Sequence, residues 1–570
     1  MTKKIIVSLI LLFVLSNVAV AQFERETRAV WLATNFRLDW PPPTFDQEKQ
    51  KHALIQIFDD IKSKNLNTVY FQAYSNGMAL FHSSFEPFSP YITGTVNGAA
   101  SYDPLKFAIE QAHKRGLEIH AWVNIFKCFN GTENNILSDP NHISKRKPEW
   151  VIEDFRDGQK SYWLDPGLPE VREYIADMLA EMVEKYDLDG VQLDYIRYPG
   201  KNFDDRLSYE KYGNGLPIDD WRRNNITDAV ALIYKKIKAV KHFVKVGAAP
   251  IGIYKNVNGV NGWEGLIEVY QDSREWLKRG IVDYLAPQIY WGIDDKPRFD
   301  VIAKEWTGNS FGRNIVLGIA AYKENVKNDM DRMIKFARAI NASGVSFFRY
   351  GNIKDDNFAF FPYKTFPASM TWLDGIRPAP PTNLVLKTIS DDKNLYSMNW
   401  QFNDSTSTTD SIRYFALYSL PNKNAELLPS HFSELIPANQ NSIKFAIPNP
   451  HQVNYYFALK SVSKLWNESV GSSNVVEVKL PEMNQLLQAS DYFARPVLFK
   501  YENRISRILL FTNMSEKIKI SGVSDGETTT LLTETVSPGK NLLELDNDLS
   551  KYQSLKIAFE SSRRELELKL

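Results

Sequence analysis

The chain has little of what disulfide-stabilised, nucleic-acid-binding or membrane-spanning proteins require. Cys128 is the only cysteine among 570 residues, so an internal disulfide is excluded and stability must come from packing. Lys plus Arg and Asp plus Glu both number 68, so no excess of charge favours a nucleic-acid or anionic membrane partner. Beyond the N-terminal region, no stretch approaches the roughly 18 continuous apolar residues of a membrane span.

Several motifs of catalysis and metal binding are also missing. The sequence contains no H-E-x-x-H, no His/Cys cluster and no calcium loop, which predicts neither a metal nor another cofactor. It contains no G-x-S-x-G nucleophile elbow, which disfavours an esterase or deacetylase. No G-x-G-x-x-G or phosphate loop follows the first predicted strand, which disfavours a doubly wound open sheet.

Residues 1–21 read as a cleaved secretory signal peptide. Two lysines precede an apolar run from Ile5 to Leu15, and the stretch ends in the small residues Ala19-Val20-Ala21. The run is too short to span a bilayer comfortably, although a retained anchor is the alternative. We therefore expect export to the periplasm, the cell surface or the extracellular space, with no membrane attachment after cleavage.

Strand-like and helix-like segments alternate through the region that we delimit as residues 25–372. Eight β/α units imply parallel strands joined by right-handed crossovers, and this predicts a (β/α)8 TIM-type barrel. The predicted strands lie at 27–36, 67–74, 117–126, within 189–200, and at 244–254, 282–291, 314–322 and 345–351. The predicted helices lie at 46–65, 105–116, 169–186, 228–243, 265–279, 298–306 and 325–341.

Two small all-β sandwich-like domains are expected after the barrel. A proline-rich linker at Pro378, Pro380 and Pro381 precedes short strands in residues 378–481, where Trp400 and alternating apolar residues suit a seven-strand sandwich. That part resembles a fibronectin type III domain in PPTNL, NW, YYFALKSVS and NESVGSSNVVEV. Residues 488–570 again contain short strands, in SRILLFTN, KIKISGV and SLKIAFES.

The segment DGVQLDYIRYPG (189–200) carries the principal catalytic candidate. If strand alternation places Gly190, Gln192 and Asp194 inside the barrel, Asp194 lies last, at the end where barrel enzymes place their chemistry. A neighbouring Arg197 would keep this carboxylate ionised and ready as nucleophile or base. The alternative is a structural carboxylate paired with Arg197, because an unpaired buried charge is costly.

Two neighbours of this aspartate receive structural assignments. Asp189 lies at the entrance end of the strand and is expected to cap the helix-to-strand turn. Tyr195 is expected to face the helix layer if the alternation continues. Arg197 and Tyr198 are expected on the following loop, where they can hold the carboxylate and a sugar.

Amides and aromatic residues end the other predicted strands, and we interpret them as a substrate-binding set. Amides hydrogen-bond hydroxyl groups and rings stack on sugar faces, so such a set suits a neutral, polyhydroxylated ligand. For any one of them, filling of the barrel is an equal alternative. The candidates are Gln72, Tyr74, Trp122, Asn124, Gln288, Tyr290, Trp291 and Tyr350, together with Arg197 and Tyr198. His120 lies one step deeper and is expected to be a satisfied interior histidine.

Glycoside hydrolysis commonly uses two carboxylates, and the partner of Asp194 is less obvious. We choose Glu264, in NGWEGL, because it lies in the long loop after the fifth strand, on the catalytic face. Asp165 is expected instead to help start the helix at Pro169. The remaining candidates are Asp272, expected inside a helix, and Asp294 and Asp295.

Residues ~25–360 resemble the glycosyl-hydrolase-like family 10 proteins of bacteria, of the divisome-localized glycosyl hydrolase type. The motifs are TRAVWLATN, LEIHAWVN, WLDPGLPEVREYI, DGVQLDYIRYPG, VDYLAPQIYW and GVSFFRYGN. The resemblance implies a TIM-type barrel, export to the envelope and glycosidase activity on peptidoglycan glycan strands, including strands without stem peptides. Asp194 matches the acidic end of the family's fourth-strand motif. Many members have Asp-Asp-Tyr where this chain has Leu193-Asp194-Tyr195.

Two functions from different classes therefore stand. The first is an exported glycoside hydrolase whose partner is a polysaccharide, with peptidoglycan glycan strands the first choice. The second is a catalytically inactive carbohydrate-binding or cell-envelope adhesion protein. The oligomeric state stays open.

Overall fold

The computed structural model describes most of the chain. The described residues are 25–131, 134–156, 158–389, 395–403, 412–446, 455–478, 496–500, 506–512, 515–537, 539–545, 547–561 and 564–570. The predicted signal peptide lies outside them, as does the predicted junction between the two β domains.

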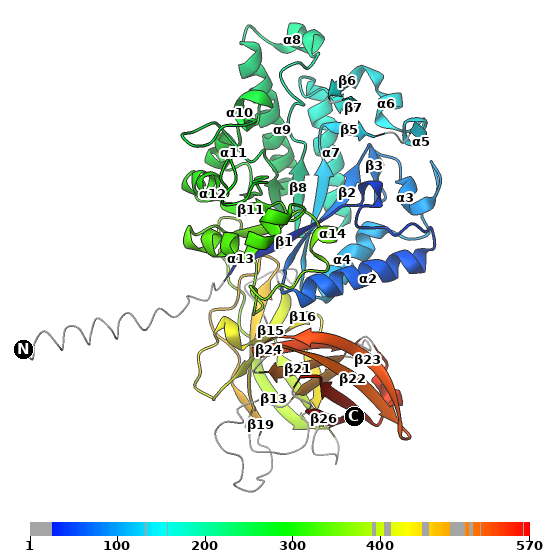
Figure 1. Cartoon of the computed structure of the whole chain (residues 1–570), viewed down its shortest axis with the longest axis vertical. Coiled ribbons are helices and arrows are strands. Elements are labelled where there is room, and N and C mark those ends of the chain that lie inside the picture. Colours follow the sequence, from blue (N-terminus) through cyan, green and yellow to red (C-terminus); the bar gives the residue numbers. More distant parts are fainter. Residues whose placement is uncertain are drawn as a thin grey trace, which may run out of the picture.

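Eight parallel strands form a closed barrel in the upper half of the molecule (Figure 1). They are β1 (Thr27–Leu32), β2 (Thr68–Ser75), β4 (Glu118–Asn124), β8 (Gly190–Asp194), β9 (Lys245–Ala248), β10 (Tyr284–Leu285), β11 (Asn314–Ile319) and β12 (Gly344–Phe347). Strand β1 pairs with both β2 and β12, which closes the sheet. The predicted (β/α)8 barrel is confirmed.

Helices of the barrel pack outside the strands. They are α2 (Gln47–Ser63), α4 (Pro104–Lys114), α7 (Pro169–Lys185), α9 (Ile218–Val240), α10 (Gly265–Glu268), α11 (Ser273–Arg279), α12 (Phe299–Gly308) and α13 (Glu324–Ala339). Helix α2 buries the apolar stripe Leu54, Ile57, Phe58 and Ile61, as its spacing predicts.

The single helix expected at 265–279 is wrong, because the chain breaks between α10 and α11. Tyr270 has a positive φ of 62°, which no helix accommodates. The Asp272 carboxylate then accepts the N–H of Glu275 at 3.3 Å and caps α11. Asp272 therefore starts a helix, where an interior position was expected.

Loops at the carboxyl ends of the strands carry additional elements (Figure 1). A three-stranded antiparallel sheet that the sequence did not predict follows β4, in the order β5–β7–β6. Its strands are β5 (Lys127–Asn130), β6 (Val151–Arg156) and β7 (Gln159–Leu164). The other short elements are β3 (Met78–Ala79), α3 (Pro90–Thr93), α5 (Asn134–Leu137), α6 (Ile143–Arg146), α8 (Arg206–Tyr212), α14 (Tyr350–Ile353) and 3-10 turns at Asn35–Arg37 and Pro148–Trp150.

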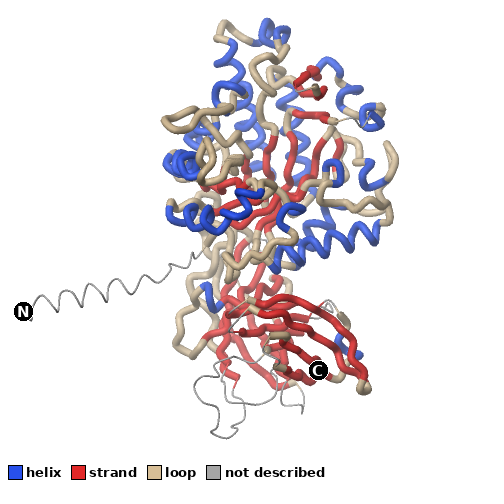
Figure 2. The backbone as a smooth tube through the Cα atoms, viewed as in Figure 1, coloured by secondary structure: helices blue, strands red, loops and turns tan. Residues whose placement is uncertain are grey.

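The C-terminal region consists of antiparallel sheets (Figure 2). One six-stranded sheet contains β13 (Thr382–Thr388), β14 (Leu395–Gln401), β17 (Ser442–Ala446), β20 (Val497–Lys500), β21 (Ser506–Thr512) and β24 (Gly539–Leu545). A second contains β16 (Phe432–Pro437), β15 (Ile412–Leu420), β18 (Tyr455–Ser463) and β19 (Val476–Val478), and a third contains β23 (Glu527–Val536), β22 (Glu516–Ser524), β25 (Ser554–Phe559) and β26 (Glu565–Lys569).

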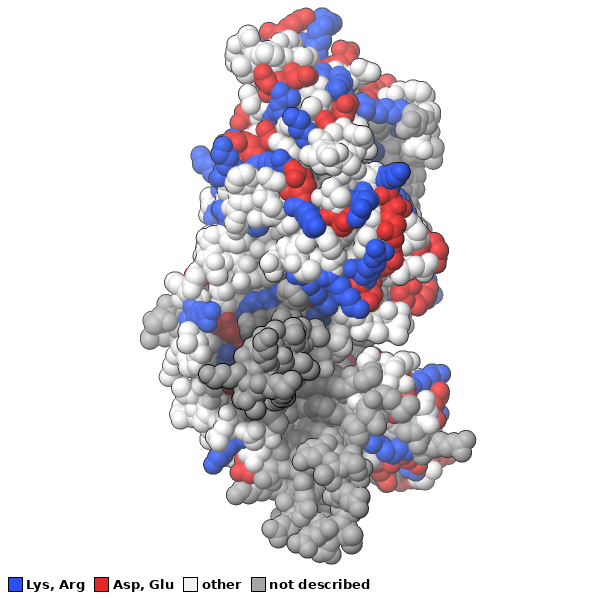
Figure 3. Space-filling model, turned by 60° about the vertical axis from the view of Figure 1, so that its left-hand side comes forward, with Lys and Arg blue, Asp and Glu red and all other residues white. Residues whose placement is uncertain are grey.

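The two predicted β regions share the six-stranded sheet, because β17 pairs with β20. Within the first region, Trp400, Phe415 and Phe457 pack together between its two sheets. The resemblance of this region to a fibronectin type III domain stays a prediction. On the face shown in Figure 3, Lys and Arg alternate with Asp and Glu over the barrel half, in keeping with the equal totals of each sign.

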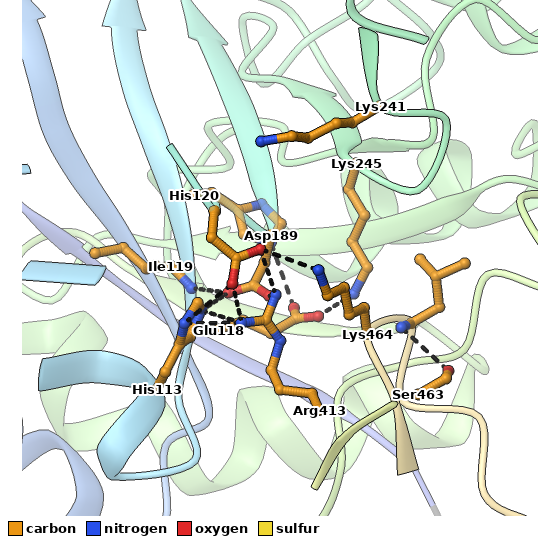
Figure 4. Close-up of polar contacts among 12 residues, drawn as sticks. His113, Glu118, Ile119, His120, Asp189, Lys241, Lys245, Arg413, Ser463 and Lys464 are labelled. Atoms are coloured by element: carbon orange, nitrogen blue, oxygen red, sulfur yellow. Dashed lines mark hydrogen bonds and ion pairs between the residues drawn. The ribbon is translucent and has the colours of Figure 1, made fainter. Parts of the chain in front are cut away.

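An ion cluster joins the amino end of the barrel to the β region (Figure 4). The Asp189 carboxylate accepts the N–H of Ile119 at 2.9 Å and contacts His113 Nε2 at 2.8 Å and Arg413 Nη2 at 3.1 Å. Arg413 comes from β15 and also pairs with Asp187, at 2.9 Å. Asp189 therefore does more than cap a turn, because it holds the two halves of the molecule together.

Burial alone would raise the pKa of Asp189, but the charges of Arg413 and His113 outweigh burial and hold that pKa well below its usual range. Because the β region packs at the amino ends of the strands, their carboxyl ends open at the opposite end of the molecule (Figure 1). None of the helices in the described ranges is both long and apolar enough to cross a bilayer.

Replacing Asp189 by asparagine is expected to lower the free energy of unfolding by about 3 kcal/mol, because Arg413 loses its buried carboxylate. The folded pKa of Asp189 lies below that of an unfolded aspartate. The stabilisation is therefore present above about pH 4 and is lost as the pH falls through the folded pKa. Urea denaturation followed by tryptophan fluorescence measures both effects.

The matched control is Arg206→Met, which breaks an exposed pair with Glu210 and is expected to cost less than about 0.5 kcal/mol. An equal loss in the two variants would show that the Asp189 cluster does not anchor the two halves.

Candidate active site at the barrel mouth

Asp194 is the last residue of β8 and lies opposite Asn124 in the register with β4. Its Oδ2 accepts the indole N–H of Trp122 at 3.1 Å. Its Oδ1 accepts the backbone N–H of Tyr195 at 2.8 Å and a longer bond from Gln288 Nε2 at 3.4 Å. The structure thus brings together Asp194, Trp122 and Gln288 inside the mouth of the barrel, as the period-two pattern predicts.

The carboxyl group of Asp194 is 8% exposed, and this burial raises its pKa. The Tyr195 N–H, the Arg197 charge, the Trp122 N–H and the Lys127 charge act in the opposite direction without cancelling burial. We expect Arg197 to keep the group ionised; its charge does act in that direction, but burial has the larger effect on the pKa. The site therefore favours a carboxyl group that retains its proton more readily than an ordinary aspartate does.

Arg197 makes no ion pair with Asp194 in the described part of the chain. Its guanidinium donates to the carbonyl of Tyr198 at 3.1 Å. It lies over the rings of Trp163, Tyr195 and Trp263, at 5.4, 5.1 and 5.1 Å from their centroids. Arg197 thus lies at the barrel mouth, with its cation stacked on aromatic rings.

Tyr195 turns toward the mouth, and its predicted position in the helix layer is wrong. Its φ of 49° breaks the strand directly after Asp194, so the alternation stops there. Its ring contacts that of Trp163, with centroids 5.8 Å apart, and Lys127 Nζ lies 4.8 Å from the Tyr195 ring centre.

An open cavity of about 740 Å³ lies between the β5–β7 sheet and the loops that follow β8 and β9. Asp154 is the only acid among its described lining residues, and Arg156 Nε donates to both of its oxygens, at 2.9 and 3.1 Å. No sequence pattern predicts this pocket, because the β5–β7 sheet lies outside the alternating β/α units. The lining residues are Lys127, Asn130, Asp154, Arg156, Gln159, Ser161, Trp163, Arg197, Pro199 and Trp263.

A second group of aromatic rings adjoins Trp122, which binds Asp194. Phe348 contacts Trp122 and Tyr290, with ring centroids 6.4 and 5.7 Å apart, and Tyr322 contacts Tyr290 at 6.0 Å. Tyr322 is 50% exposed, and Trp263, in the pocket, is 44% exposed. The mouth thus presents partly exposed rings, which are suited to stacking on sugars.

Three predicted substrate-binding tyrosines do not reach the mouth. The Tyr74 hydroxyl is buried and donates to Glu86 at 3.1 Å, because a register irregularity follows Gln72 and turns the side chain outward. Tyr198 is fully buried and accepts a hydrogen bond from Asn225 at 3.1 Å. Tyr350 lies in α14, where it interacts with Asp60 of α2.

The aromatic ring that was expected from Tyr350 at the end of the eighth strand comes from Phe348, because β12 ends at Phe347. The Phe348 ring contacts that of Tyr290. Gln72 supports the mouth indirectly, since its Oε1 accepts the N–H groups of Thr34 and Asn35 at 3.0 and 2.8 Å. Asn124 is buried, and its Oδ1 has no hydrogen-bond partner among the described residues. Trp291 is half-buried beside the loop after β9.

His120 lies deeper in the barrel and is a satisfied interior histidine, as expected. Its Nδ1 is 2.7 Å from the Tyr284 hydroxyl, and its Nε2 is 3.3 Å from Glu118. Glu118 also forms a buried ion pair with Lys245. Within the described ranges, no group of three or more His, Cys, Asp or Glu side chains has the arrangement of a metal site.

The acids proposed as second carboxylate lie apart from Asp194. Glu264 accepts the N–H of Asn256 at 2.7 Å, within its own loop. Asp165 accepts the N–H of Gly167 at 2.8 Å, and burial raises its pKa to about 6. Asp294 pairs with Arg332, and Asp295 accepts the N–H of Gly292. Among the described residues, none of these acids shares a hydrogen-bonding partner with Asp194, so the choice of Glu264 stays a prediction.

Asp154 is the acid that sequence reasoning missed. Its charge and that of Asp194 both act on Lys127 and on Arg197, although neither acid forms an ion pair with either cation in the described chain. No signal in the sequence distinguished it, because it lies on a hairpin strand outside the eight β/α units.

Comparisons with known proteins identify a family for this chain. A family model described as "Glycosyl hydrolase-like 10" matches residues 26–334. The chain is 32% identical over 514 residues to the glycosyl hydrolase YngK of Bacillus subtilis (strain 168), covering 83% of this chain and 98% of the relative. It is 36% identical over 340 residues to the glycosyl hydrolase DigH of Escherichia coli (strain K12), covering 55% of this chain and 77% of that relative.

Among solved structures, the glycoside hydrolase domain of PgaB (BpsB) from Bordetella bronchiseptica aligns with a TM-score of 0.43 at 14% identity. The alignment covers 59% of this chain and 96% of that domain.

The variant Asp194→Asn is expected to be more stable than the natural protein at pH 7. A carboxyl group whose pKa is higher in the folded than in the unfolded protein lowers the free energy of unfolding as the pH rises above the unfolded pKa. The asparagine amide cannot ionise, so the variant does not suffer this loss. The gain in thermal midpoint should therefore vanish near pH 4. A variant that is equally destabilised at both pH values would contradict the raised pKa.

Proposed function

The chain belongs to the glycosyl hydrolase-like 10 family, and we propose that it is an exported glycoside hydrolase acting on a polysaccharide. Peptidoglycan glycan strands are the first choice of substrate. The observation that carries the proposal is the buried Asp194 carboxyl at the carboxyl end of β8, in a mouth that carries two groups of aromatic rings. Barrel enzymes place their catalytic groups at this end of the strands.

Asp194 acts as the general acid in this proposal. Its raised pKa lets it keep a proton to a higher pH than an ordinary aspartate does and deliver that proton to the departing glycosidic oxygen. Trp122 and Gln288 orient the carboxyl group, each through one N–H. The rings of Tyr290 and Trp163 belong to the aromatic groups of the mouth, on which sugars can stack.

A second group must supply the nucleophile or activate water. Asp154 is the acid that the described lining of the pocket offers, and both of its oxygens accept a hydrogen bond from Arg156. Glu264 is the alternative from the loop after β9. Enzymes that use the acetamido group of the sugar itself as nucleophile need no second carboxylate of this kind. Asp154→Asn and Glu264→Gln separate these mechanisms, because only loss of the working group abolishes turnover.

The runner-up is a carbohydrate-binding or adhesion protein without catalysis. The absence of a carboxylate in contact with Asp194 among the described residues favours it. Retained binding of glycan strands without any bond cleavage is the result that it requires.

Release of new reducing ends from denuded peptidoglycan strands tests the proposal. Asp194→Asn is expected to reduce release by about 10²- to 10⁴-fold, the usual contribution of a general acid. Asp294→Asn, an exposed acid paired with Arg332, is the matched control and should leave the rate unchanged. Equal release by the natural protein and Asp194→Asn would remove Asp194 from the mechanism.

The pH dependence gives an independent check. Activity should fall as the pH rises through the pKa of Asp194, because only the protonated form donates. Trp122→Phe removes an N–H that lowers this pKa, so the alkaline limb should move to higher pH. A rate profile for this variant with an unmoved or acid-shifted alkaline limb would contradict the role of the indole N–H.

A further inference from the structure

We propose that the pocket beside Asp194 binds a carboxylate carried by the glycan, through Lys127 and Arg197, so that the preferred substrate is an acidic polysaccharide. This inference rests on the proposed function and adds a chemical requirement to it. The juxtaposition that carries it is two unpaired cations on one aromatic wall of the cavity, next to the candidate acid.

The charges lining the pocket do not balance. Among the described residues that line it, Lys127, Arg156 and Arg197 face one acid, Asp154. Arg156 already binds both oxygens of Asp154 and donates to the carbonyl of Pro199. The Asp154 charge is therefore held by Arg156, and the remaining two cations are left for a ligand.

Neither Lys127 nor Arg197 has an ion-pair partner within 4.0 Å among the residues that the structure describes. Lys127 Nζ lies over the rings of Trp163 and Tyr195, at 5.7 and 4.8 Å from their centroids. Arg197 uses one of its N–H groups on the Tyr198 carbonyl and lies over the same two rings. Both side chains are half-buried, so each holds its charge where solvation is incomplete.

Burial lowers the pKa of Lys127 to about 8, and the neighbouring Arg197 charge acts in the same direction. An anion placed between the two cations would relieve this repulsion. A carboxylate suits the position, because a guanidinium can offer two parallel N–H groups to its two oxygens while the ammonium supplies a third. The rings of Trp163 and Trp263 would then contact the sugar that carries it.

The same carboxylate would act on the candidate acid. Lys127 and Arg197 each lower the pKa of Asp194, so their neutralisation by a bound anion raises it further. Binding of an acidic sugar therefore helps Asp194 to keep the proton that it donates. A neutral glycan leaves both cations uncompensated and lacks this effect.

Two classes of sugar provide such a group: a uronic acid and a sugar with a carboxyl-bearing ether substituent, as in muramic acid. The test compares peptidoglycan strands without stem peptides, the same strands with their carboxyl groups converted to methyl amides, and a polyuronate. For the natural protein we expect kcat/KM to fall about tenfold to a hundredfold on amidation, the range for loss of a charged hydrogen bond. Cleavage of the polyuronate decides which class supplies the carboxylate.

Lys127→Met should lose most of this discrimination, so that its ratio of kcat/KM for native over amidated strands approaches one whatever its absolute rate, and Lys127→Arg should restore part of the ratio. Lys160→Met is the matched control, because Lys160 is an exposed lysine of β7 that pairs with Glu153 at 2.8 Å. It should discriminate like the natural protein.

Equal cleavage of native and amidated strands by the natural protein would overturn the carboxylate site while leaving the hydrolase intact. If no glycan is cleaved at all, the proposed function fails, and calorimetric binding of the same strands still decides the inference. In that case, affinity that is unchanged by amidation or by Lys127→Met would overturn it.

Discussion

The removal of one carboxyl group from water is the constraint on which the candidate site depends. Asp194 ends β8 inside a closed barrel, where few waters reach it and where hydrogen bonds from Trp122 and Tyr195 hold it in one orientation. Burial raises its pKa even though Lys127 and Arg197 oppose the shift. The other side chains of the mouth shift the balance between the protonated and the ionised form of Asp194. The rings exclude water, the two cations favour ionisation, and Gln288 fixes one oxygen.

A second aspartate next to the same strand shows that the environment, and not the residue type, decides the protonation state. Asp189 immediately precedes β8 and is as buried as Asp194, yet Arg413 and His113 hold its pKa below the usual range. At the other end of the strand, no cation pairs directly with Asp194 in the described chain. One short strand thus carries an ionised anchor for the β region at its amino end and a proton-holding group at its carboxyl end.

Much of the barrel could be predicted from the sequence, because eight apolar strands alternate with amphipathic helices. Since alternate residues of a strand face the same side, the inward positions of Asp194 and Trp122 could be predicted as well. The failures have local physical causes. The positive φ of Tyr195 ends the alternation one residue early, and the irregularity after Gln72 turns Tyr74 outward. The β5–β7 hairpins lie outside the β/α pattern, so Asp154 and Lys127 went unnoticed. The pairing of Asp189 with Arg413 joins residues far apart in sequence, and local patterns carry no information about it.

The central claim is that burial keeps Asp194 protonated at a pH where an ordinary aspartate is ionised. Carbon-13 NMR of the protein labelled at its aspartate carboxyl carbons measures this directly, with the Asp194 signal assigned by its absence in Asp194→Asn. The account predicts a titration midpoint clearly above the value of about 3.9 found for an unperturbed aspartate. A midpoint at or below that value would contradict it, because the cations of the mouth would then outweigh burial.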